Sequence, residues 1–285
     1  CRRTDELFGC SILLVSIERG GAKMSVLTVD NITVGYGKRL ILENQSIVFD
    51  KPEIISIIGP NGSGKSTFLK ALARLIKIKQ GTISLDEKSL HSWNTKELAR
   101  HIALLPQITT APEGMLVEQL VRSGRNPYVS IFKELSDADL ATVEKAMKCT
   151  DVWKYRYRQI GELSGGERQR VWLSLSLAQE PNILLLDEPT TYLDSRHQIE
   201  LMELVKRTQR ERNIMVVMVL HDLNLALRYS DRIIAIKEGA IVGDGTPHMM
   251  MTPENLAEWF GIKADILQSP RSEETCPICV PYGLA

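Results

Sequence analysis

The fold is decided by an apolar run and the loop that follows it: Ile54-Ile-Ser-Ile-Ile58, then Gly59-Pro-Asn-Gly-Ser-Gly64-Lys65-Ser66-Thr67. The run is apolar at nearly every position, which is typical of a strand buried on both faces of a sheet. After the loop, apolar residues recur at helical spacing over residues 65–76. This order of strand, glycine-rich loop and helix matches the phosphate-loop pattern G-x-x-x-x-G-K-[ST].

The loop has the chemistry that the phosphates of a nucleotide require. Its glycines let several backbone N–H groups point inward around a phosphate, and the start of the helix adds roughly half a positive charge. Lys65 supplies a full charge to the β- and γ-phosphates, and the hydroxyl of Ser66 is placed for Mg²⁺. We therefore expect consecutive residues of the loop to bind the nucleotide: Gly59, Pro60, Asn61, Gly62, Ser63, Gly64, Lys65, Ser66 and Thr67.

A second apolar run, Ile183-Leu-Leu-Leu-Asp187-Glu188, ends in two acids. Acids at the carboxyl end of a strand in an α/β sheet face the ligand crevice. An Asp-Glu pair after a strand is by itself more often a turn, but the phosphate loop in the same chain favours a functional interpretation. We expect Asp187 to hold Mg²⁺ and Glu188 to act as the general base that polarises the attacking water.

A third motif, Leu163-Ser164-Gly165-Gly166-Glu167, precedes a helical pattern. Ser164 and Glu167 have the spacing of a capping box, which is a purely structural device. The two glycines also expose backbone N–H groups at a helix start, and this makes a second anion site. The chain therefore carries two predicted phosphate-binding devices.

The remaining pattern alternates short apolar runs with helical segments, which predicts a largely parallel sheet. Residues 108–160 differ, because they carry helical patterns and few strand signals; we expect a helical subdomain there, inserted into an α/β core, with one helix starting at Ser136. A turn is expected at Gly35-Tyr36-Gly37, and a less regular tail from Ser269. We expect strands over residues 25–29, 32–34, 54–58, 182–187, 214–220 and 233–236, and helices over residues 65–76, 167–179, 198–212, 222–229 and 253–260.

Composition sets broad limits on the function. The 285 residues are 44% hydrophobic and 25% charged, which is ordinary for a folded globular chain. Lys and Arg number 35, as do Asp and Glu, so the chain lacks the basic excess typical of proteins that live on nucleic acid or anionic lipid. The longest apolar runs, residues 10–17 and 214–220, are shorter than the ~20 residues that span a bilayer.

The cysteines do not form a disulfide framework, since they are an odd number in a long chain; they are Cys1, Cys10, Cys149, Cys276 and Cys279. A reducing compartment is the better fit. The pair Cys276-Pro-Ile-Cys279 is a single CxxC with no second pair and no histidine nearby. We expect a tail with incidental thiols, with a zinc or redox site as the alternative.

The first methionine is Met24. Residues 1–23 resemble a signal peptide poorly, because Asp5 and Glu6 interrupt the basic end and no clear cleavage site follows. The stretch Glu18-Arg19-Gly20-Gly21 back-translates to a purine-rich segment a few codons before Met24, as a translated bacterial ribosome-binding site would. We therefore expect a start at Met24, with one domain over residues 24–268 and a tail over 269–285.

The joint occurrence of these motifs resembles the ATP-binding cassette (ABC) ATPases, the nucleotide-binding subunits of ABC transporters. The resemblance runs from Val26 to Gly283, and Leu163-Ser-Gly-Gly-Glu167 matches the family signature. It implies a P-loop NTPase core with an inserted helical subdomain and an N-terminal antiparallel β subdomain. It also implies ATP and Mg²⁺ as ligands. Two cassettes of this family close head to tail, so that Ser164, Gly165 and Gly166 of one copy complete the ATP site of the other.

The family pattern implies roles for further residues. Tyr36 stands where an aromatic ring stacks on adenine, and Gln107 where a glutamine contacts Mg²⁺ and senses the attacking water. Leu193-Asp194 stands in the dimer-contact loop, and His221 where a histidine contacts the γ-phosphate. The other histidines are expected to be structural: His91, His101, His197 and His248.

Several segments resemble a narrower group, the importers of ferric siderophores, ferric citrate, haem and cobalamin; among them are Gly124-Arg-Asn-Pro-Tyr128, Val219-Leu-His-Asp-Leu-Asn224 and the closing segment from Cys276. This resemblance implies a membrane permease and a substrate-binding lipoprotein or periplasmic protein as partners, no nucleic acid, and a peripheral place on the cytoplasmic face of the membrane. The expected cargo is an iron(III) chelate, with haem, cobalamin or another cargo as alternatives. Two departures from the group, Gln45 and residues 51–53, touch no nucleotide position. A third, Ser195-Arg196, is expected to tune the dimer contact and leaves hydrolysis intact.

Three competing classes fit less well. Exporters often fuse the cassette to membrane spans, and ribosome-acting relatives usually carry two cassettes in one chain. DNA-repair relatives place long coiled coils between the phosphate loop and the signature, and the stretch from Lys65 to Ser164 has no room for them. A general P-loop kinase conflicts with Leu163-Ser-Gly-Gly-Glu167 and with His221.

Overall fold

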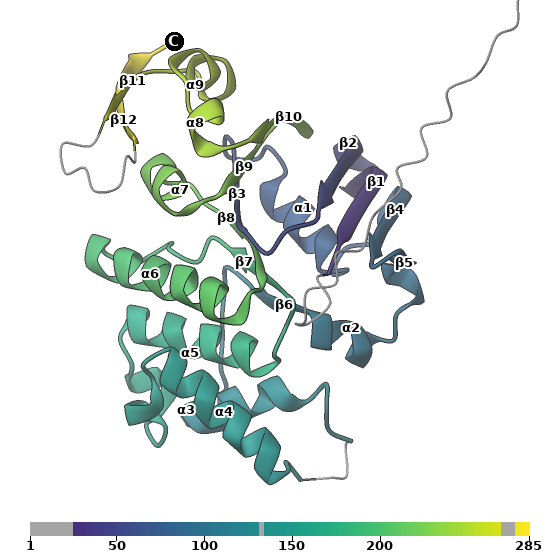
Figure 1. Ribbon diagram of the computed structural model, residues 1–285, viewed down its shortest axis with the longest axis vertical. Helices are drawn as coiled ribbons and strands as arrows, with labels where there is room; N and C mark the ends of the chain where they lie inside the picture. Colours follow the sequence, from purple (N-terminus) through teal and green to yellow (C-terminus); the bar gives the residue numbers. More distant parts are fainter. Residues whose placement is uncertain (1–24, 131–133, 269–276) are drawn as a thin grey trace, which may run out of the picture.

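The computed structural model describes residues 25–130, 134–268 and 277–285 of the chain (Figure 1). The predictions for residues 1–23, the start at Met24 and the thiol of Cys276 lie outside the described residues. In the described part of the chain, no helix combines the length and the apolar character needed to cross a membrane.

Strands and helices alternate along most of the chain. In chain order, the elements are β1 (Leu27–Tyr36), β2 (Arg39–Phe49), β3 (Ile54–Ile58), α1 (Lys65–Leu72), β4 (Ile78–Leu85), β5 (Lys88–Ser89), η1 (Leu90–Ser92), α2 (Thr95–His101), β6 (Ile102–Leu105), α3 (Val117–Arg122), η2 (Ser123–Arg125), α4 (Asp137–Cys149), η3 (Trp153–Tyr155), η4 (Ile160–Glu162), α5 (Gly165–Ala178), β7 (Ile183–Asp187), α6 (Ser195–Arg212), β8 (Met215–Val219), α7 (Leu223–Tyr229), β9 (Arg232–Lys237), β10 (Ala240–Gly245), α8 (Pro247–Met250), α9 (Pro253–Phe260), β11 (Ile262–Gln268) and β12 (Pro277–Leu284).

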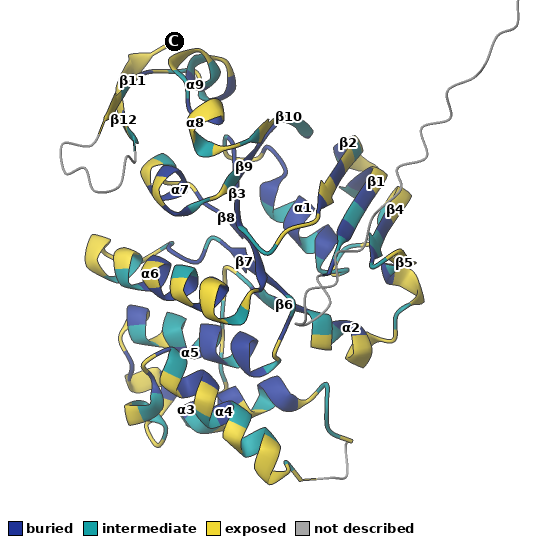
Figure 2. Ribbon diagram, viewed as in Figure 1, coloured by how far each residue is buried: buried dark blue, intermediate teal, exposed yellow. Residues whose placement is uncertain are grey.

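The centre of the molecule is a six-stranded sheet in the order β10-β9-β3-β8-β7-β6. Its strands pair in parallel from β9 to β6, and β10 adds an antiparallel edge. Every residue of β3, β7 and β8 is buried, as expected of strands covered on both faces (Figure 2). The predicted parallel sheet is confirmed.

Alternate residues of these strands enter two different cores. Ile54 and Ile58 of β3 pack in a core with α5, α6 and α7, whereas Ile55 and Ile57 pack in a second core with α1. Side chains of a strand alternate between the faces of its sheet. The helices α1 and α5 therefore cover opposite faces, and the two glycine-rich motifs that precede them lie on different sides of the molecule (Figure 1).

A second sheet, in the order β2-β1-β4-β5, covers the outer side of α1. Its strands pair antiparallel, which confirms the antiparallel N-terminal subdomain. The turn expected at Gly35-Tyr36-Gly37 lies later: β1 continues to Tyr36, which pairs with Arg39, and Gly37 turns the chain with φ 54°. That positive φ suits glycine, and it sets where the hairpin reverses.

Between β6 and β7 the chain leaves the sheet to form α3, α4 and α5. Ser136 caps α4, since its side chain accepts from the N–H of Asp139 and its own N–H donates to the Asp139 carboxylate. The predicted helix start is confirmed. Val117, Val121 and Val143 pack these helices together in the core that also holds α6.

The end of the chain differs from the expected irregular tail. Residues 277–284 form β12, which pairs antiparallel with β11. Asn224, on α7, fastens this strand: its amide donates to the carbonyl of Cys279 and its oxygen accepts from the N–H of Cys279. Burial raises the pKa of the Cys279 thiol, so it stays protonated. Among the described residues no cluster of three or more His, Cys, Asp or Glu side chains could hold a metal ion.

The double packing of α1 yields a stability prediction. Phe68 is fully buried between the six-stranded sheet and the N-terminal sheet, so Phe68→Ala leaves a cavity with little chance to collapse. We expect the free energy of unfolding to fall by about 3–5 kcal/mol, measured by urea denaturation. Leu75→Ala, at a side chain 65% exposed just beyond α1, is the matched control and should stay within about 0.5 kcal/mol of the wild type. Equal losses for both would contradict the packing described.

Candidate nucleotide site

The loop between β3 and α1 has a positive φ at three glycines, Gly59, Gly62 and Gly64, a conformation that other residues rarely adopt. Gly59 has φ 149°, and a Cβ at this position would lie 2.0 Å from the carbonyl oxygen of Ile236 on β9. Gly64, with φ 107°, forms the N-cap of α1. Because no side-chain cap bonds the first N–H groups of α1, these donors are left for an anion, as the motif predicts.

Lys65 is drawn into the loop. Its ammonium donates to the carbonyl oxygens of Gly59 (2.9 Å) and Pro60 (2.8 Å), and the residue is buried. Burial lowers the pKa of Lys65, while the carboxylates of Glu188 and Asp187 act to raise it. The loop thus holds a concentrated charge at the place where the sequence predicts the phosphates.

Asp187, the last residue of β7, is a buried carboxylate with no hydrogen bond. The residue is 1% exposed, and neither side-chain oxygen has a hydrogen-bond partner. The ammonium of Lys70 lies 3.8 Å from Oδ2, which is an ion-pair distance but too long for a hydrogen bond. A buried carboxylate is costly unless a cation compensates it. An orphaned hard oxygen donor at the end of this strand fits the predicted Mg²⁺.

Glu188, the next residue, is held from three sides. Its Oε1 lies 2.6 Å from Nε2 of His221, and its Oε2 accepts from Nε2 of Gln107 (2.6 Å) and from the hydroxyl of Thr191 (3.1 Å). The structure therefore brings together Gln107, Glu188 and His221. They meet because Gln107 follows β6, Glu188 follows β7 and His221 follows β8, and these strands are parallel neighbours in the sheet.

Two residues near the acids were not predicted. Thr191 bonds Glu188 from three positions later, and Lys70 faces Asp187 from α1. Thr191 carries a local signal, because a hydroxyl shortly after a strand-end acid can reach back to it. The sequence signal for Lys70 is weaker: Lys70 follows Ser66 by four residues, which places the two side chains on the same face of the helix.

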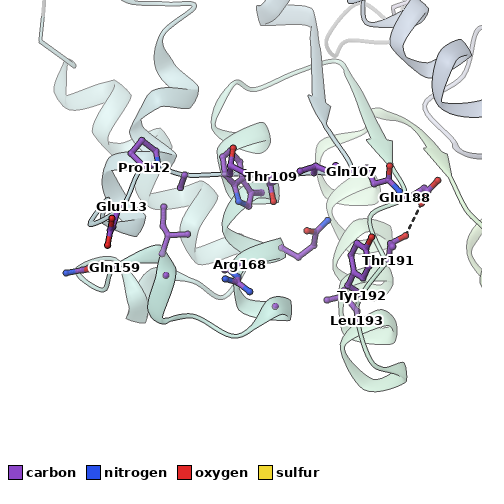
Figure 3. Close-up of a pocket in the computed structure, with 18 of the residues that line it drawn as sticks. Gln107, Thr109, Pro112, Glu113, Gln159, Arg168, Glu188, Thr191, Tyr192 and Leu193 are labelled. Atoms are coloured by element: carbon purple, nitrogen blue, oxygen red, sulfur yellow. Dashed lines mark hydrogen bonds between the residues drawn. The ribbon is translucent and has the colours of Figure 1, made fainter.

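A cleft of about 630 Å³ opens beside this group (Figure 3). It runs from Gln107 and Glu188 to the start of α5, where Gly165 and Arg168 line it. Figure 3 shows Gln107, Glu188 and Thr191 toward one side of the cleft, with Pro112, Glu113 and Gln159 toward the other. The cleft thus joins the carboxylate of Glu188 to the segment after β6 and to the third motif.

The third motif has the predicted cap. The Oγ of Ser164 accepts from the N–H of Glu167 (3.3 Å), and the N–H of Ser164 donates to the Glu167 carboxylate (2.8 Å). Hydrogen bonds from the Tyr155 hydroxyl and the Ser164 backbone lower the pKa of Glu167 to about 2. The ionised Glu167 thereby fixes the start of α5, and the predicted capping box is confirmed.

Other predicted residues lie apart from the acids. Tyr36, 53% exposed, stands at the hairpin between β1 and β2; two residues of β2, Ile41 and Leu42, border Gly64 of the loop. His197, assigned a structural role, bonds Asp194 through Nδ1 (2.8 Å) and packs against Gly166. His101 bonds Asn182 (3.3 Å), which also fits a structural role.

Comparison with known proteins gives one consistent result. Residues 42–191 match the family model described as ABC transporter. The iron(3+)-hydroxamate import ATP-binding protein of Bacillus subtilis (strain 168) is 42% identical over 261 residues, 92% of this chain and 96% of that protein. The ferric enterobactin transport ATP-binding protein of Escherichia coli (strain K12) is 41% identical over 254 residues, 89% of this chain and 93% of that protein.

A solved structure agrees with these sequence relatives. A dimeric structure of an ATP-binding cassette in a post-hydrolysis state, bound to ADP and Pi, is 28% identical. It aligns with a TM-score of 0.67 over 78% of this chain and 98% of that chain.

The packing of Gly166 on His197 yields a second prediction. A Cβ on Gly166 would lie 2.5 Å from Cδ2 of His197, whose ring is tied to Asp194. We expect Gly166→Ala to lower the free energy of unfolding by roughly 1–3 kcal/mol, because the ring cannot move freely. In a His197→Ala background the same change should be neutral or stabilising by up to about 1 kcal/mol, since alanine is the better helix former. Urea denaturation of the four proteins measures the coupling, and additive effects would contradict the contact.

Proposed function

The chain belongs to the ABC transporter family, and on that premise we propose that it is the ATP-hydrolysing subunit of an importer of an iron(III) chelate. The observation that carries the hydrolytic part is the grouping of Gln107, Glu188 and His221 at the ends of adjacent strands, next to the buried Asp187. A carboxylate at this place can take a proton from the attacking water, and its two neighbours fix its orientation.

The phosphate loop and the acids divide the work of binding. The N–H groups at the start of α1 and the ammonium of Lys65 bind the phosphates, and Tyr36 stacks on the base. Asp187, Ser66 and Gln107 are the residues that would hold Mg²⁺, since they offer the oxygen ligands that this ion prefers. When bound, Mg²⁺ neutralises charge on the phosphate oxygens.

Glu188 is the general base in this proposal. Both of its oxygens are engaged, Oε1 toward His221 and Oε2 by Gln107 and Thr191. Each carboxylate oxygen has two acceptor positions, so Oε1, whose one partner is His221, can still accept a proton from water, while Gln107 and Thr191 hold Oε2 in place. Gln107, Glu188 and Thr191 all line the cleft, so a group that fills the cleft lies against the base and two of its partners.

A second copy of the chain completes the site. Within one chain the phosphate loop belongs to α1 and the residues Ser164, Gly165 and Gly166 belong to α5, and these helices cover opposite faces of the sheet. One copy alone therefore keeps the two anion sites apart. A head-to-tail dimer, in which each copy offers its α5 start to the nucleotide of the other, lets both act on one ATP. The dimeric cassette with ADP and Pi supports this arrangement.

The transport part of the proposal rests on the relatives. The Bacillus subtilis protein takes part in iron(3+)-hydroxamate import and the Escherichia coli protein in ferric enterobactin transport, and the chain matches nearly the whole length of both. We assign this chain to the cytoplasmic face of a membrane, bound to a separate permease that receives its iron(III) chelate from a substrate-binding protein. The two cargoes differ in chemistry, so what the relatives share is an iron(III) chelate rather than one siderophore.

The base is tested by Glu188→Gln, which keeps the shape of the side chain and removes its ability to take a proton. We expect ATP binding close to that of the wild type and a fall in turnover of about 10²–10⁴-fold, measured as phosphate release and by binding of a fluorescent ATP analogue.

Lys65→Ala is the contrasting variant, because the ammonium belongs to the phosphate loop. It should weaken ATP binding itself, so the two variants separate binding from chemistry. Unchanged turnover in Glu188→Gln would remove Glu188 as the base.

The transport role is tested by affinity purification of the tagged chain from solubilised native membranes, followed by mass spectrometry. We expect a multi-span permease in near-equal amount to the cassette, and uptake of a radiolabelled iron(III) siderophore that is lost in the Glu188→Gln strain. Recovery of ribosomes or nucleic-acid factors in place of a permease would contradict the proposal.

A further inference from the structure

We propose that Lys70 is a positioning residue of the metal site: its ammonium balances the buried carboxylate of Asp187 until Mg²⁺ displaces it. The inference rests on the proposed nucleotide site. It adds Lys70 to that site, together with a competition between Lys70 and Mg²⁺ for Asp187. Lys70 is outside the phosphate-loop motif, and its ammonium lies at ion-pair distance from Asp187.

The first support is the position of Lys70 on α1. Lys70 follows Ser66 by four residues, so the two side chains share one face of the helix. That face is turned toward β7, because the Lys70 ammonium reaches within 3.8 Å of Asp187 at the end of that strand. Ser66 and Asp187 are the two predicted metal ligands that α1 and β7 contribute, and Lys70 stands one helical turn behind the first and beside the second.

The second support is the state of Asp187. Its side chain is 1% exposed, and both oxygens lack hydrogen bonds. Burying an ionised carboxylate without a compensating charge is strongly unfavourable in proteins. In the described part of the chain, Lys70 is the cation that lies within 4.0 Å of this carboxylate.

Lys65, the nearer candidate by sequence, is otherwise engaged. Its ammonium donates to the carbonyl oxygens of Gly59 and Pro60. Lys65 and Asp187 still attract each other through space, but the Lys65 ammonium is fixed on the loop, and Lys70 supplies the ion pair at Asp187.

The third support is the mobility that the exposure of Lys70 permits. The Lys70 side chain is 38% exposed, against 1% for Asp187. A half-exposed lysine can swing its ammonium into water at little cost, whereas Asp187 cannot leave its place at the end of a buried strand. Arrival of Mg²⁺ at Asp187 brings a stronger cation to the same oxygens, and Lys70 is then repelled rather than attracted. Lys70 and Mg²⁺ are thus expected to compete.

The competition is tested with Lys70→Met in the full chain. The midpoint of thermal unfolding is recorded at a fixed concentration of a non-hydrolysable ATP analogue, first with EDTA and then with rising Mg²⁺. In EDTA we expect the variant to unfold roughly 2–4 °C below the wild type, because Asp187 has lost its counter-charge. At saturating Mg²⁺ the deficit should vanish, and the Mg²⁺ concentration for half of the stabilisation should fall by about threefold.

Three further proteins make the result unambiguous. Lys70→Arg keeps the charge and should behave as the wild type at every Mg²⁺ concentration. Lys77→Met removes an exposed lysine beyond α1 and should change neither the midpoint nor the Mg²⁺ dependence. Lys70→Gln, which keeps a polar stem, replaces the methionine variant if that protein does not fold.

The outcomes are separable from those of the proposed function. A deficit of the same size with and without Mg²⁺, or no deficit in EDTA, overturns the role of Lys70 while the nucleotide site stands. A wild type that Mg²⁺ and the analogue do not stabilise overturns the nucleotide site, and the role of Lys70 with it.

Discussion

The register of three parallel strands is the constraint on which the rest of the molecule depends. Leu105 of β6 pairs with Leu186 of β7, and Asp187 of β7 pairs with Val219 of β8. With this register Gln107, Glu188 and His221 leave the sheet at nearly the same level and meet. A slip of one residue would move each of Asp187 and Glu188 to the other face of the sheet. It would also point the apolar side chains of β7 into the core that they do not fill now. Packing and chemistry therefore select the same register.

Buried charges gather near the end of β7, and burying them lowers the stability of the folded chain. Asp187 is buried without a hydrogen bond, and Lys65 is buried with its ammonium on backbone carbonyls. Two apolar cores surround these groups and supply the hydrophobic stabilisation that holds them in place. Such a site stays intact because the strand that carries it cannot move, whereas its partners on helices and loops can.

Those partners connect the acids to the rest of the chain. Gln107 begins the segment that lines the cleft, and the start of α5 lies on the same cleft. Glu188 lines this cleft itself, together with its partners Gln107 and Thr191, so a group bound in the cleft meets the base and two of the side chains that hold it. The placement of α1 and α5 on opposite faces adds a second consequence, because the two glycine-rich motifs of one chain lie apart. In the proposed function, both features make hydrolysis depend on what binds the chain from outside.

The sequence by itself determined the elements whose cause is local. The glycines of the phosphate loop, the capping boxes at Ser136 and Ser164, and the apolar runs of β3 and β7 each follow from dihedral freedom, capping or periodicity within a few residues. The family pattern added the candidates Gln107 and His221, which no local rule would have selected.

Only the tertiary structure decided which distant residues touch. The ion pair of Lys70 with Asp187 and the β12 strand fastened by Asn224 both join segments whose spacing carries little or no signal. The tail from Ser269 was expected to be irregular because it is polar and contains prolines, yet its described part, residues 277–284, pairs with β11 and bonds the amide of Asn224. Local patterns fix the conformation of a segment, whereas the order and register of the strands fix its neighbours.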